Sequence, residues 1–201
     1  MKTNIAVLVS GGGTYLQALL EAEAAGKIPH GEIAMVISNN PNAYALERAK
    51  NFGVPAACIN KKELGSQAAF EAELQAVLER NGTDLIILAG FMCILSENFT
   101  SKWPRKIINV HPALIPSFCG EGYYGLRVHQ AALDYGVKVT GATVHFVNEI
   151  PDGGEIIAQK AVYIEEGDTP EILQRRVMEQ AEWILLPQAA EKVCASLQKS
   201  K

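Results

Sequence analysis

The sequence predicts one α/β domain over residues 1–201, with a doubly wound, mostly parallel, Rossmann-like sheet and an antiparallel or mixed edge. Apolar runs of strand length alternate with helical patterns through the first half of the chain. The run LIILAG at residues 85–90 has no polar face, which is typical of a strand buried on both sides of a parallel sheet. The last two β runs are joined by NEIPDGG, which is too short for a parallel crossover.

The first part of the chain reads as a strand, a glycine turn and a helix, and this unit then repeats. Strands are expected at residues 4–10, 33–38, 56–59, 85–90 and 107–110. Helices are expected at residues 14–25, 43–52, 66–80 and 96–102. Ligands in such sheets bind outside the carboxyl ends of the strands, so polar residues that follow these strands are candidates for a site.

Two β runs and a long terminal helix complete the chain, at residues 138–147, 155–164 and 169–197. Asp168 or Thr169 is a suitable N-cap for this helix, and Pro170 fits its first turn. Pro187 is expected to kink or interrupt the helix, because proline removes one backbone donor and clashes with the preceding turn.

The composition excludes several classes of partner. The 18 basic and 22 acidic residues give a net charge of −4, and no basic run is long enough to follow a nucleic-acid backbone. No apolar run reaches the roughly 20 residues needed to span a membrane. The N-terminus does not read as a signal peptide, and the four scattered cysteines form no C-x-x-C pair. We therefore expect a cytoplasmic protein with reduced thiols that acts on small molecules as a monomer or homodimer.

A glycine-rich segment, SGGGTYLQ at residues 10–17, lies between the first predicted strand and the first predicted helix. Backbone N–H groups at a helix N-terminus can hold a phosphate there. The segment lacks the third glycine of the dinucleotide motif, and no acidic residue ends the second strand. A mononucleotide or sugar phosphate therefore fits better than NAD, and the alternative is a tight turn without a ligand.

Four polar side chains fall at strand ends or in the last inter-strand connection: Asn109, His111, His145 and Asp152. An imidazole near neutral pKa moves protons, an amide donates to a developing oxyanion, and a carboxylate orients the imidazole or relays a proton through water. Together these groups suit the attack of an amine on a carbonyl. His145 lies inside an apolar strand, where a hydrogen-bonded core histidine is the alternative to a catalytic one.

A metal site is the other alternative for these side chains. His111, His145 and Asp152 form a possible two-histidine, one-carboxylate set. No H-E-x-x-H or similar pair lies on one element, so we expect no metal. His30 and His129 are expected in loops or on a helix surface, without a role in the site.

The chain resembles the folate-dependent formyltransferases, and within them the branch that acts in purine biosynthesis. The segments that carry the resemblance follow the family's order and cover nearly the whole chain. They are VSGGGTYLQ, LAGFMCIL, NVHPALIPSF, GATVHFVNE, PDGGEIIAQ and EGDTPEIL. The resemblance implies the formyltransferase variant of the Rossmann-like fold.

It also implies that 10-formyltetrahydrofolate, as cosubstrate, donates a formyl group to the amine of glycinamide ribonucleotide without a metal. Asn109, His111 and Asp152 are then the catalytic residues, with His145 in a supporting role. Asn109 and a protonated His111 stabilise the oxyanion, and Asp152 keeps His111 charged and helps to move a proton to the departing folate nitrogen.

The same resemblance implies two sets of binding residues. The ribonucleotide is expected to meet Gly12, Gly13, Thr14, Tyr15 and Glu182. The folate is expected to meet Gln67, Met92, Cys93, Ile94, Leu95, Asn109, Val147, Asn148, Glu149, Ile150, Pro151 and Asp152.

Three positions depart from the family's pattern. Tyr15 stands where Asn is common, Cys93 where Arg is common, and Gln67 where Arg or Lys is frequent. The last two remove positive charge from the expected place of the folate tail. The affinity for either substrate is then either lower or supplied by Lys61, Lys62 or Arg127.

A longer segment at residues 119–129 contains three glycines and is expected to be a mobile loop near the site.

Two other functions remain open. One is a sibling formyltransferase that acts on methionyl-tRNA or hydrolyses formyltetrahydrofolate. The other is a non-catalytic module that binds folate or a nucleotide.

Overall fold

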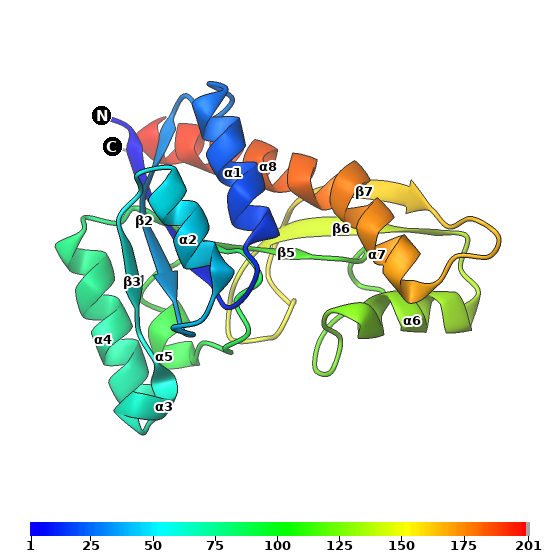
Figure 1. Ribbon diagram of the computed structural model, residues 1–201, viewed down its shortest axis with the longest axis horizontal. Coiled ribbons are helices and arrows are strands. Elements are labelled where there is room, and N and C mark those ends of the chain that lie inside the picture. The colour runs from blue at the N-terminus through cyan, green and yellow to red at the C-terminus, as the bar shows by residue number, and fades with distance from the viewer. Residues whose placement is uncertain (200–201) are drawn as a thin grey trace.

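Seven strands form one mixed sheet in the computed structural model, which describes residues 1–199 (Figure 1). They are β1 (Thr3–Val9), β2 (Gly31–Ser38), β3 (Ala56–Cys58), β4 (Leu85–Leu88), β5 (Ile107–His111), β6 (Val139–Phe146) and β7 (Ile156–Tyr163). Their order across the sheet is β3-β2-β1-β4-β5-β6-β7. Strands β1 to β5 are parallel, whereas β6 and β7 are antiparallel additions at one side. The predicted doubly wound sheet with an antiparallel edge is confirmed.

Helices cover both faces of this sheet. They are α1 (Thr14–Ala24), α2 (Tyr44–Asn51), α3 (Lys61–Leu64), α4 (Gln67–Arg80), α5 (Glu97–Thr100), α6 (Leu126–Tyr135), α7 (Pro170–Val177) and α8 (Trp183–Lys199), with a π-helical turn η1 (Met178–Glu182) before α8. Figure 1 shows α1, α2 and α8 on one face, and α4 and α5 on the other. Within residues 1–199, no helix is long and apolar enough to cross a membrane.

The central strand β1 shows why this arrangement forms. Ile5, Val7 and Val9 point into the core cluster under α1 and α8. Ala6 and Leu8 point into the cluster under α4. Successive side chains of a strand alternate between faces, so an unbroken apolar run serves both clusters at once.

Side-chain caps determine where three helices begin. Ser66 accepts the N–H of Ala69 at the start of α4, and Ser96 does the same for Phe99 at α5. At α7 the cap is Thr169 rather than Asp168, with Pro170 as the first helical residue.

The segment expected as a mobile loop at residues 119–129 is a loop as far as Gly125, where α6 follows, and its mobility stays a prediction. Two expectations about helices were wrong. His129 on α6 is only 1% exposed rather than at the surface. The terminal helix departs from α geometry at η1, upstream of Pro187, which lies inside α8. Pro187 donates no N–H to the preceding turn, so the helix continues through it with one bond fewer.

Candidate active site

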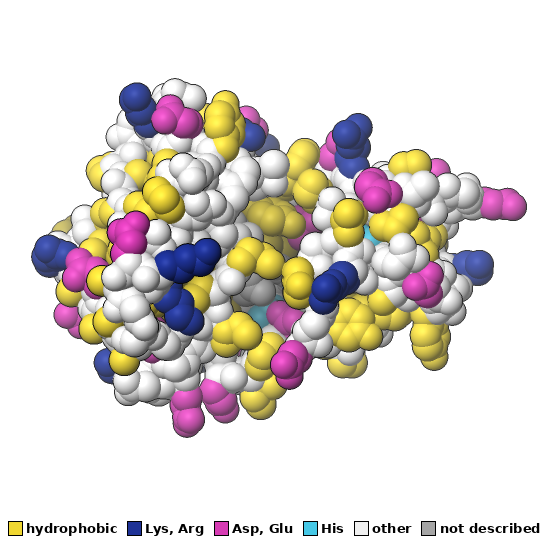
Figure 2. Space-filling model, turned by 60° about the horizontal axis from the view of Figure 1, so that its bottom comes forward, with side chains coloured by type: hydrophobic (Ala, Val, Ile, Leu, Met, Phe, Trp, Pro, Cys, Tyr) yellow, Lys and Arg dark blue, Asp and Glu magenta, His cyan; other side chains and the backbone are white. Residues whose placement is uncertain are grey.

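The carboxyl ends of β1 and β4 lie side by side. Strands β2 and β3 follow on one side of β1, and β4 to β7 follow on its other side, so the strand order reverses between β1 and β4. This is the place where open α/β sheets bind ligands. The loop after β1 contains Ser10, whose Oγ accepts the N–H of Met92 in the loop after β4 at 2.8 Å. Figure 2 shows a hollow in the middle of one face of the molecule, with histidine and acidic side chains at its floor.

Antiparallel pairing of β5 with β6 places Asn109 opposite His145 and His111 opposite Thr143. Asn109 and His111 are two positions apart and therefore face the same side of the sheet. Nδ2 of Asn109 lies 3.4 Å from Nε2 of His145, whose Nδ1 lies 2.8 Å from the carbonyl oxygen of Phe146. With Nδ1–H donated to this carbonyl, Nε2 of His145 accepts from the amide, which orients Asn109 and leaves its second N–H for a ligand.

Asp152 joins this group from the connection between β6 and β7. Its Oδ2 lies 3.4 Å from Nδ1 of His111 and accepts the N–H of Gly120 at 2.9 Å, and its Oδ1 lies 3.6 Å from Nε2 of His145. Its φ of 56° is in the left-handed region, which costs a non-glycine residue about 1–2 kcal/mol. Such strain is concentrated at functional sites. The structure therefore brings together all four polar residues that the sequence singled out.

The two central groups shift each other's pKa. Burial raises the pKa of Asp152, but contacts with His145, His111 and the Gly120 N–H outweigh burial, so the pKa lies below its usual 3.8. Burial lowers the pKa of His111 below 6.5, and the opposing effects of Asp152 and of the Phe118 carbonyl are smaller. These directions favour a charged Asp152 and a neutral His111 near pH 7 in the ligand-free site, and protonation of His111 during the reaction stays a prediction.

The turn after β5 contains residues of the site that the sequence did not single out. The carbonyl oxygen of Phe118 lies 2.8 Å from Nε2 of His111, and the φ of Phe118 is 50°. Thr143 accepts the N–H of Ile115 at 3.1 Å, and Gln159 donates to the carbonyl of Ile115 at 2.9 Å. This turn is therefore bound to both antiparallel strands, and only the pairing of the strands reveals these contacts.

The glycine loop lies against the first turn of α2. The N–H of Ala45 donates to the carbonyl of Gly11 at 3.1 Å. Gly13, with a φ of 72°, precedes α1, and no side chain caps this helix. The first N–H groups of α1 have no partner inside the helix, so they are available to an anion.

Replacement of Gly13 by alanine is expected to distort this loop. A Cβ there would lie 2.7 Å from the Cβ of Ala45, and alanine disfavours the positive φ. We expect Gly13→Ala to lower the free energy of unfolding by about 2–4 kcal/mol. Gly11→Ala, whose Cβ would meet nothing within 4 Å, is the control, with an expected change below about 1 kcal/mol. Urea denaturation measures both; equal stability of the two variants would contradict the close packing at Gly13.

Tyr15 and Glu182 form a buried pair on the other side of this loop. The Tyr15 hydroxyl donates to Oε1 of Glu182 at 2.8 Å, and Oε2 of Glu182 has no hydrogen-bond partner among residues 1–199. Burial raises the pKa of Glu182 to about 7, although the Tyr15 hydrogen bond partly opposes this shift. Burial and the nearby Glu182 raise the pKa of Tyr15 well above 10. Glu182 is 0% exposed in the ligand-free structure, and its expected contact with the substrate stays a prediction.

An open hollow of about 900 Å³ lies beside the loop that follows β4. Four residues of the expected folate set line it, namely Gln67, Met92, Cys93 and Ile94. Lys61 and Lys62 also line it and supply positive charge at its rim. Gln67 donates to the carbonyl of Ile94 at 3.1 Å, so it supports the loop as well as lining the hollow.

The rest of the expected folate set is divided between the core and the β6–β7 connection. Leu95 is 6% exposed and belongs to the core cluster under α4, which corrects its expected place in the pocket wall. Val147 packs against the same cluster as Cys93. The remaining expected residues lie in the connection between β6 and β7 and are not among the residues that line this hollow, and they are Asn148, Glu149, Ile150 and Pro151.

The histidines and cysteines are not arranged as metal ligands. Among residues 1–199, no group of three or more His, Cys, Asp or Glu side chains is placed to hold a metal ion. Nε2 of His111 and Nδ1 of His145 face backbone carbonyls, which fixes the orientation of both rings. Nδ1 of His30 lies 2.5 Å from Oε1 of Glu191 on α8 and belongs to none of the contacts of the cluster.

Comparison with known proteins identifies the family. The formyl transferase family model matches residues 3–189. Phosphoribosylglycinamide formyltransferase of Haemophilus influenzae is 42% identical over 176 residues, which are 88% of this chain and 80% of that protein. The trifunctional purine biosynthetic protein adenosine-3 of Bos taurus is 44% identical over 195 residues, 96% of this chain. The chain spans only 18% of the length of that relative.

A solved structure agrees with these matches. The crystal structure of glycinamide ribonucleotide transformylase 1 from Symbiobacterium toebii superposes with a TM-score of 0.90 at 41% identity, covering 97% of this chain and 89% of that one. The likeness therefore extends over nearly the whole chain. The chain belongs to the formyl transferase family.

Proposed function

We propose that this chain transfers the formyl group of 10-formyltetrahydrofolate to the amine of phosphoribosylglycinamide, a step of purine biosynthesis. One observation carries the proposal. An amide donor, an imidazole and a charged carboxylate converge at the carboxyl end of β5, which pairs with β4 beside the switch point, in a family whose H. influenzae member is named for this reaction. An uncapped helix N-terminus and an open hollow flank this group, and they suit a phosphate and an extended cosubstrate respectively.

The proposed reaction is a direct displacement. The lone pair of the substrate amine attacks the formyl carbon, and the carbonyl electrons move to the formyl oxygen. The resulting oxyanion is held by the free N–H of Asn109 and by Nε2–H of His111. The oxyanion then re-forms the carbonyl while the bond to folate N10 breaks.

Asp152 is the proposed partner for the protons. The attacking nitrogen must lose a proton and folate N10 must gain one, so the two transfers balance. The charged carboxylate accepts the first proton through water and returns a proton towards N10. Because its pKa is lowered, the carboxylate is unprotonated at neutral pH and can accept a proton.

His111 acts in this proposal as a neutral donor. Its Nε2 already lies 2.8 Å from an oxygen, the carbonyl of Phe118, and the oxyanion takes the place of this carbonyl. A neutral imidazole with its proton on Nε2 can make this bond without being charged beforehand. The growing negative charge of the oxyanion then favours protonation at Nδ1, beside Asp152.

The chain's own residues fit a folate at the hollow beside the site. Its walls combine Met92 and Ile94, which are exposed apolar side chains, with the basic Lys61 and Lys62. Mostly apolar walls with a few polar groups are typical of ligand pockets. We propose that the two lysines compensate for the charge that Gln67 lacks and meet the anionic tail.

The proposal is tested by following the absorbance of 10-formyltetrahydrofolate when phosphoribosylglycinamide is added to the purified chain. Loss of the formyl group that requires the ribonucleotide is the expected result, and it should persist after exhaustive chelation because no proposed step uses a metal. Loss without the ribonucleotide would indicate the hydrolase sibling. Folate binding without any turnover would indicate a non-catalytic module and would overturn the proposal.

A further inference from the structure

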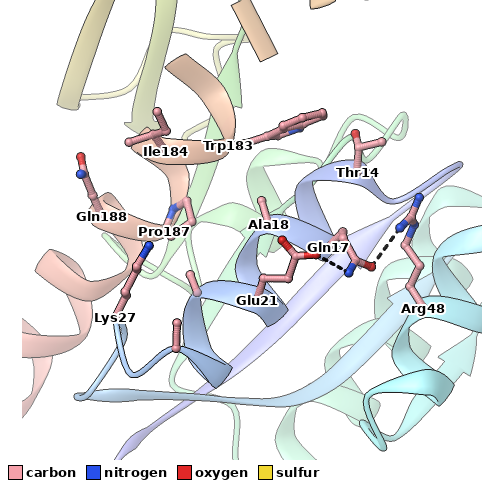
Figure 3. A pocket seen from close by; sticks show the side chains of 12 residues that line it. Thr14, Gln17, Ala18, Glu21, Lys27, Arg48, Trp183, Ile184, Pro187 and Gln188 are labelled. Atoms are coloured by element: carbon pink, nitrogen blue, oxygen red, sulfur yellow. Dashed lines mark hydrogen bonds between the residues drawn. The ribbon is translucent and has the colours of Figure 1, made fainter. Parts of the chain in front are cut away.

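Arg48, in the last turn of α2, contacts the glycine loop in a way that the family resemblance did not indicate. Its Nε donates to the carbonyl of Gly12 at 2.8 Å, and its Nη1 donates to Oε1 of Gln17 at 2.9 Å. Figure 3 shows Arg48 and Gln17 at one end of a pocket between α1 and α8. Gln17 in turn donates to Glu21 at 2.7 Å, so the amide of Gln17 has a fixed orientation.

The position of Arg48 is also fixed by packing. Its guanidinium carbon lies 5.1 Å from the centre of the Tyr44 ring, and its Cδ would be 3.3 Å from a Cβ at Gly13. No carboxylate within residues 1–199 forms an ion pair with Arg48 at 4.0 Å or less. A cation with a planar set of donors is therefore held against the loop by contacts other than an acidic partner.

These contacts determine which way two peptide groups face. The carbonyl of Gly11 is bound by the N–H of Ala45, and the carbonyl of Gly12 is bound by Arg48. In a trans peptide the C=O and the following N–H point in opposite directions. The N–H groups of Gly12 and Gly13 therefore point away from α2, and neither donates to another residue of the described chain.

We propose that Arg48 is a positioning residue of the phosphate subsite, which holds the Gly12 carbonyl so that the N–H of Gly13 is aimed at the phosphate of the ribonucleotide. This inference rests on the proposed function for the identity of the ligand. It does not place Arg48 in contact with the reacting atoms. Loss of Arg48 frees the Gly12–Gly13 peptide to rotate, and its N–H then no longer points reliably at the phosphate.

The test compares Arg48→Met and Arg48→Lys with Lys50→Met, which removes an exposed cation from the same helix. We expect both Arg48 variants to raise KM for phosphoribosylglycinamide about tenfold or more, because one charge-assisted contact is lost, with kcat little changed. The loss should disappear with glycinamide riboside, which has no phosphate. Lysine should not rescue, because its single ammonium cannot reproduce the planar donor pair. Full rescue by lysine, equal losses with both substrates, or a fall in kcat alone would overturn the inference.

A binding measurement separates this inference from the proposed function. Titration of ribose 5-phosphate by calorimetry needs no turnover, and we expect the Arg48→Met protein to bind it about tenfold more weakly than the unsubstituted protein. This result would stand even if no formyl transfer were observed. Normal binding by a correctly folded Arg48→Met protein, or no binding by the unsubstituted protein, would overturn the role of Arg48. If Arg48→Met does not fold, Gln17→Leu removes the acceptor that helps to hold Arg48 in place. We then expect a smaller loss of ribose 5-phosphate affinity.

Discussion

Asp152→Asn is expected to lower kcat about 100-fold or more, with KM for the ribonucleotide within about threefold of normal. Of the contacting pair Asp152 and His111, the carboxylate is the group that carries the charge near neutral pH, since both pKa values are lowered. An amide at this position still accepts the N–H of Gly120 but cannot accept a proton from the substrate amine. The proposed phosphate subsite lies on a different loop, so ribonucleotide binding should be spared.

The matched control is Glu121→Gln, which removes an exposed carboxylate next to Gly120, the residue whose N–H Asp152 accepts. Steady-state kinetics of both variants, with circular dichroism to confirm folding, provide the comparison. A Glu121→Gln protein with normal turnover would show that loss of a nearby negative charge is not itself harmful. Near-normal turnover of Asp152→Asn would refute the proposed proton transfer.

The double variant with His111→Ala adds a second criterion. Asp152 and His111 are in contact at 3.4 Å, and residues that act as a unit are strongly non-additive. We expect the double variant to lose little more activity than the worse of the two single variants. Full additivity would mean that the carboxylate and the imidazole act in separate steps.

The sheet could be predicted because its strands carry a strong local signal. The strand β4 is apolar at every position and β1 is apolar from Ile5 to Val9, as expected for strands that are buried on both faces. Asn109 and His111 could be predicted as site residues because they end such a strand. The partnership with His145 and Asp152 was a hypothesis until the antiparallel pairing of β5 and β6 placed them together.

Other features depend on contacts that no local pattern reveals. The helix α6 was not predicted, because three glycines lie close to its start. Val128 and Ala132 nevertheless have helical spacing, and both are buried. His129 is buried with them, and burial lowers its pKa to about 4. A histidine within a short amphipathic segment is usually exposed, so only the packing of α6 could correct this expectation.

The hydrogen bond between Tyr15 and buried Glu182 is the clearest contact that no local pattern reveals. A glutamate in the terminal helix is expected at the surface, yet this one lies in the π-helical turn η1, fully buried under Tyr15. Tyr15 occupies a position where the family commonly has asparagine. The departure at Tyr15 therefore has a structural partner, which the sequence alone could not identify because the two residues are 167 positions apart.

Glu182→Gln is expected to remove a pH dependence of stability on the order of 3 kcal/mol between pH 4.5 and pH 8. The pKa of Glu182 is raised from 4.5 to about 7, so the folded protein holds a proton that the unfolded chain releases. Folding is therefore favoured at low pH, and this contribution is lost as the pH rises through the interval between 4.5 and about 7. Glutamine keeps the acceptor for Tyr15 but does not titrate.

The measurement is the free energy of unfolding in urea at pH 5 and at pH 8, for Glu182→Gln and for Glu179→Gln. Glu179 is an exposed carboxylate in the same turn, so its variant should keep the pH dependence of the unsubstituted protein. Other groups, including His111 and His129, also change stability over this range, so the quantity that matters is the difference between the two variants. An equal pH dependence in both would mean that Glu182 is charged in the folded protein at neutral pH.

Tyr15→Phe tests whether the destabilisation that buried Glu182 causes near neutral pH is linked to ligand binding. Without the hydroxyl, both oxygens of Glu182 lack a partner, so the pKa of Glu182 should rise further and the protein should lose about 1–3 kcal/mol at pH 8. A buried carboxylate that weakens the fold near neutral pH is explained if a donor of the ribonucleotide completes its bonding. Ribonucleotide should then stabilise the unsubstituted protein more at pH 8 than at pH 5, and this difference should be absent from Glu182→Gln. Equal stabilisation at both pH values would assign Glu182 to the fold alone.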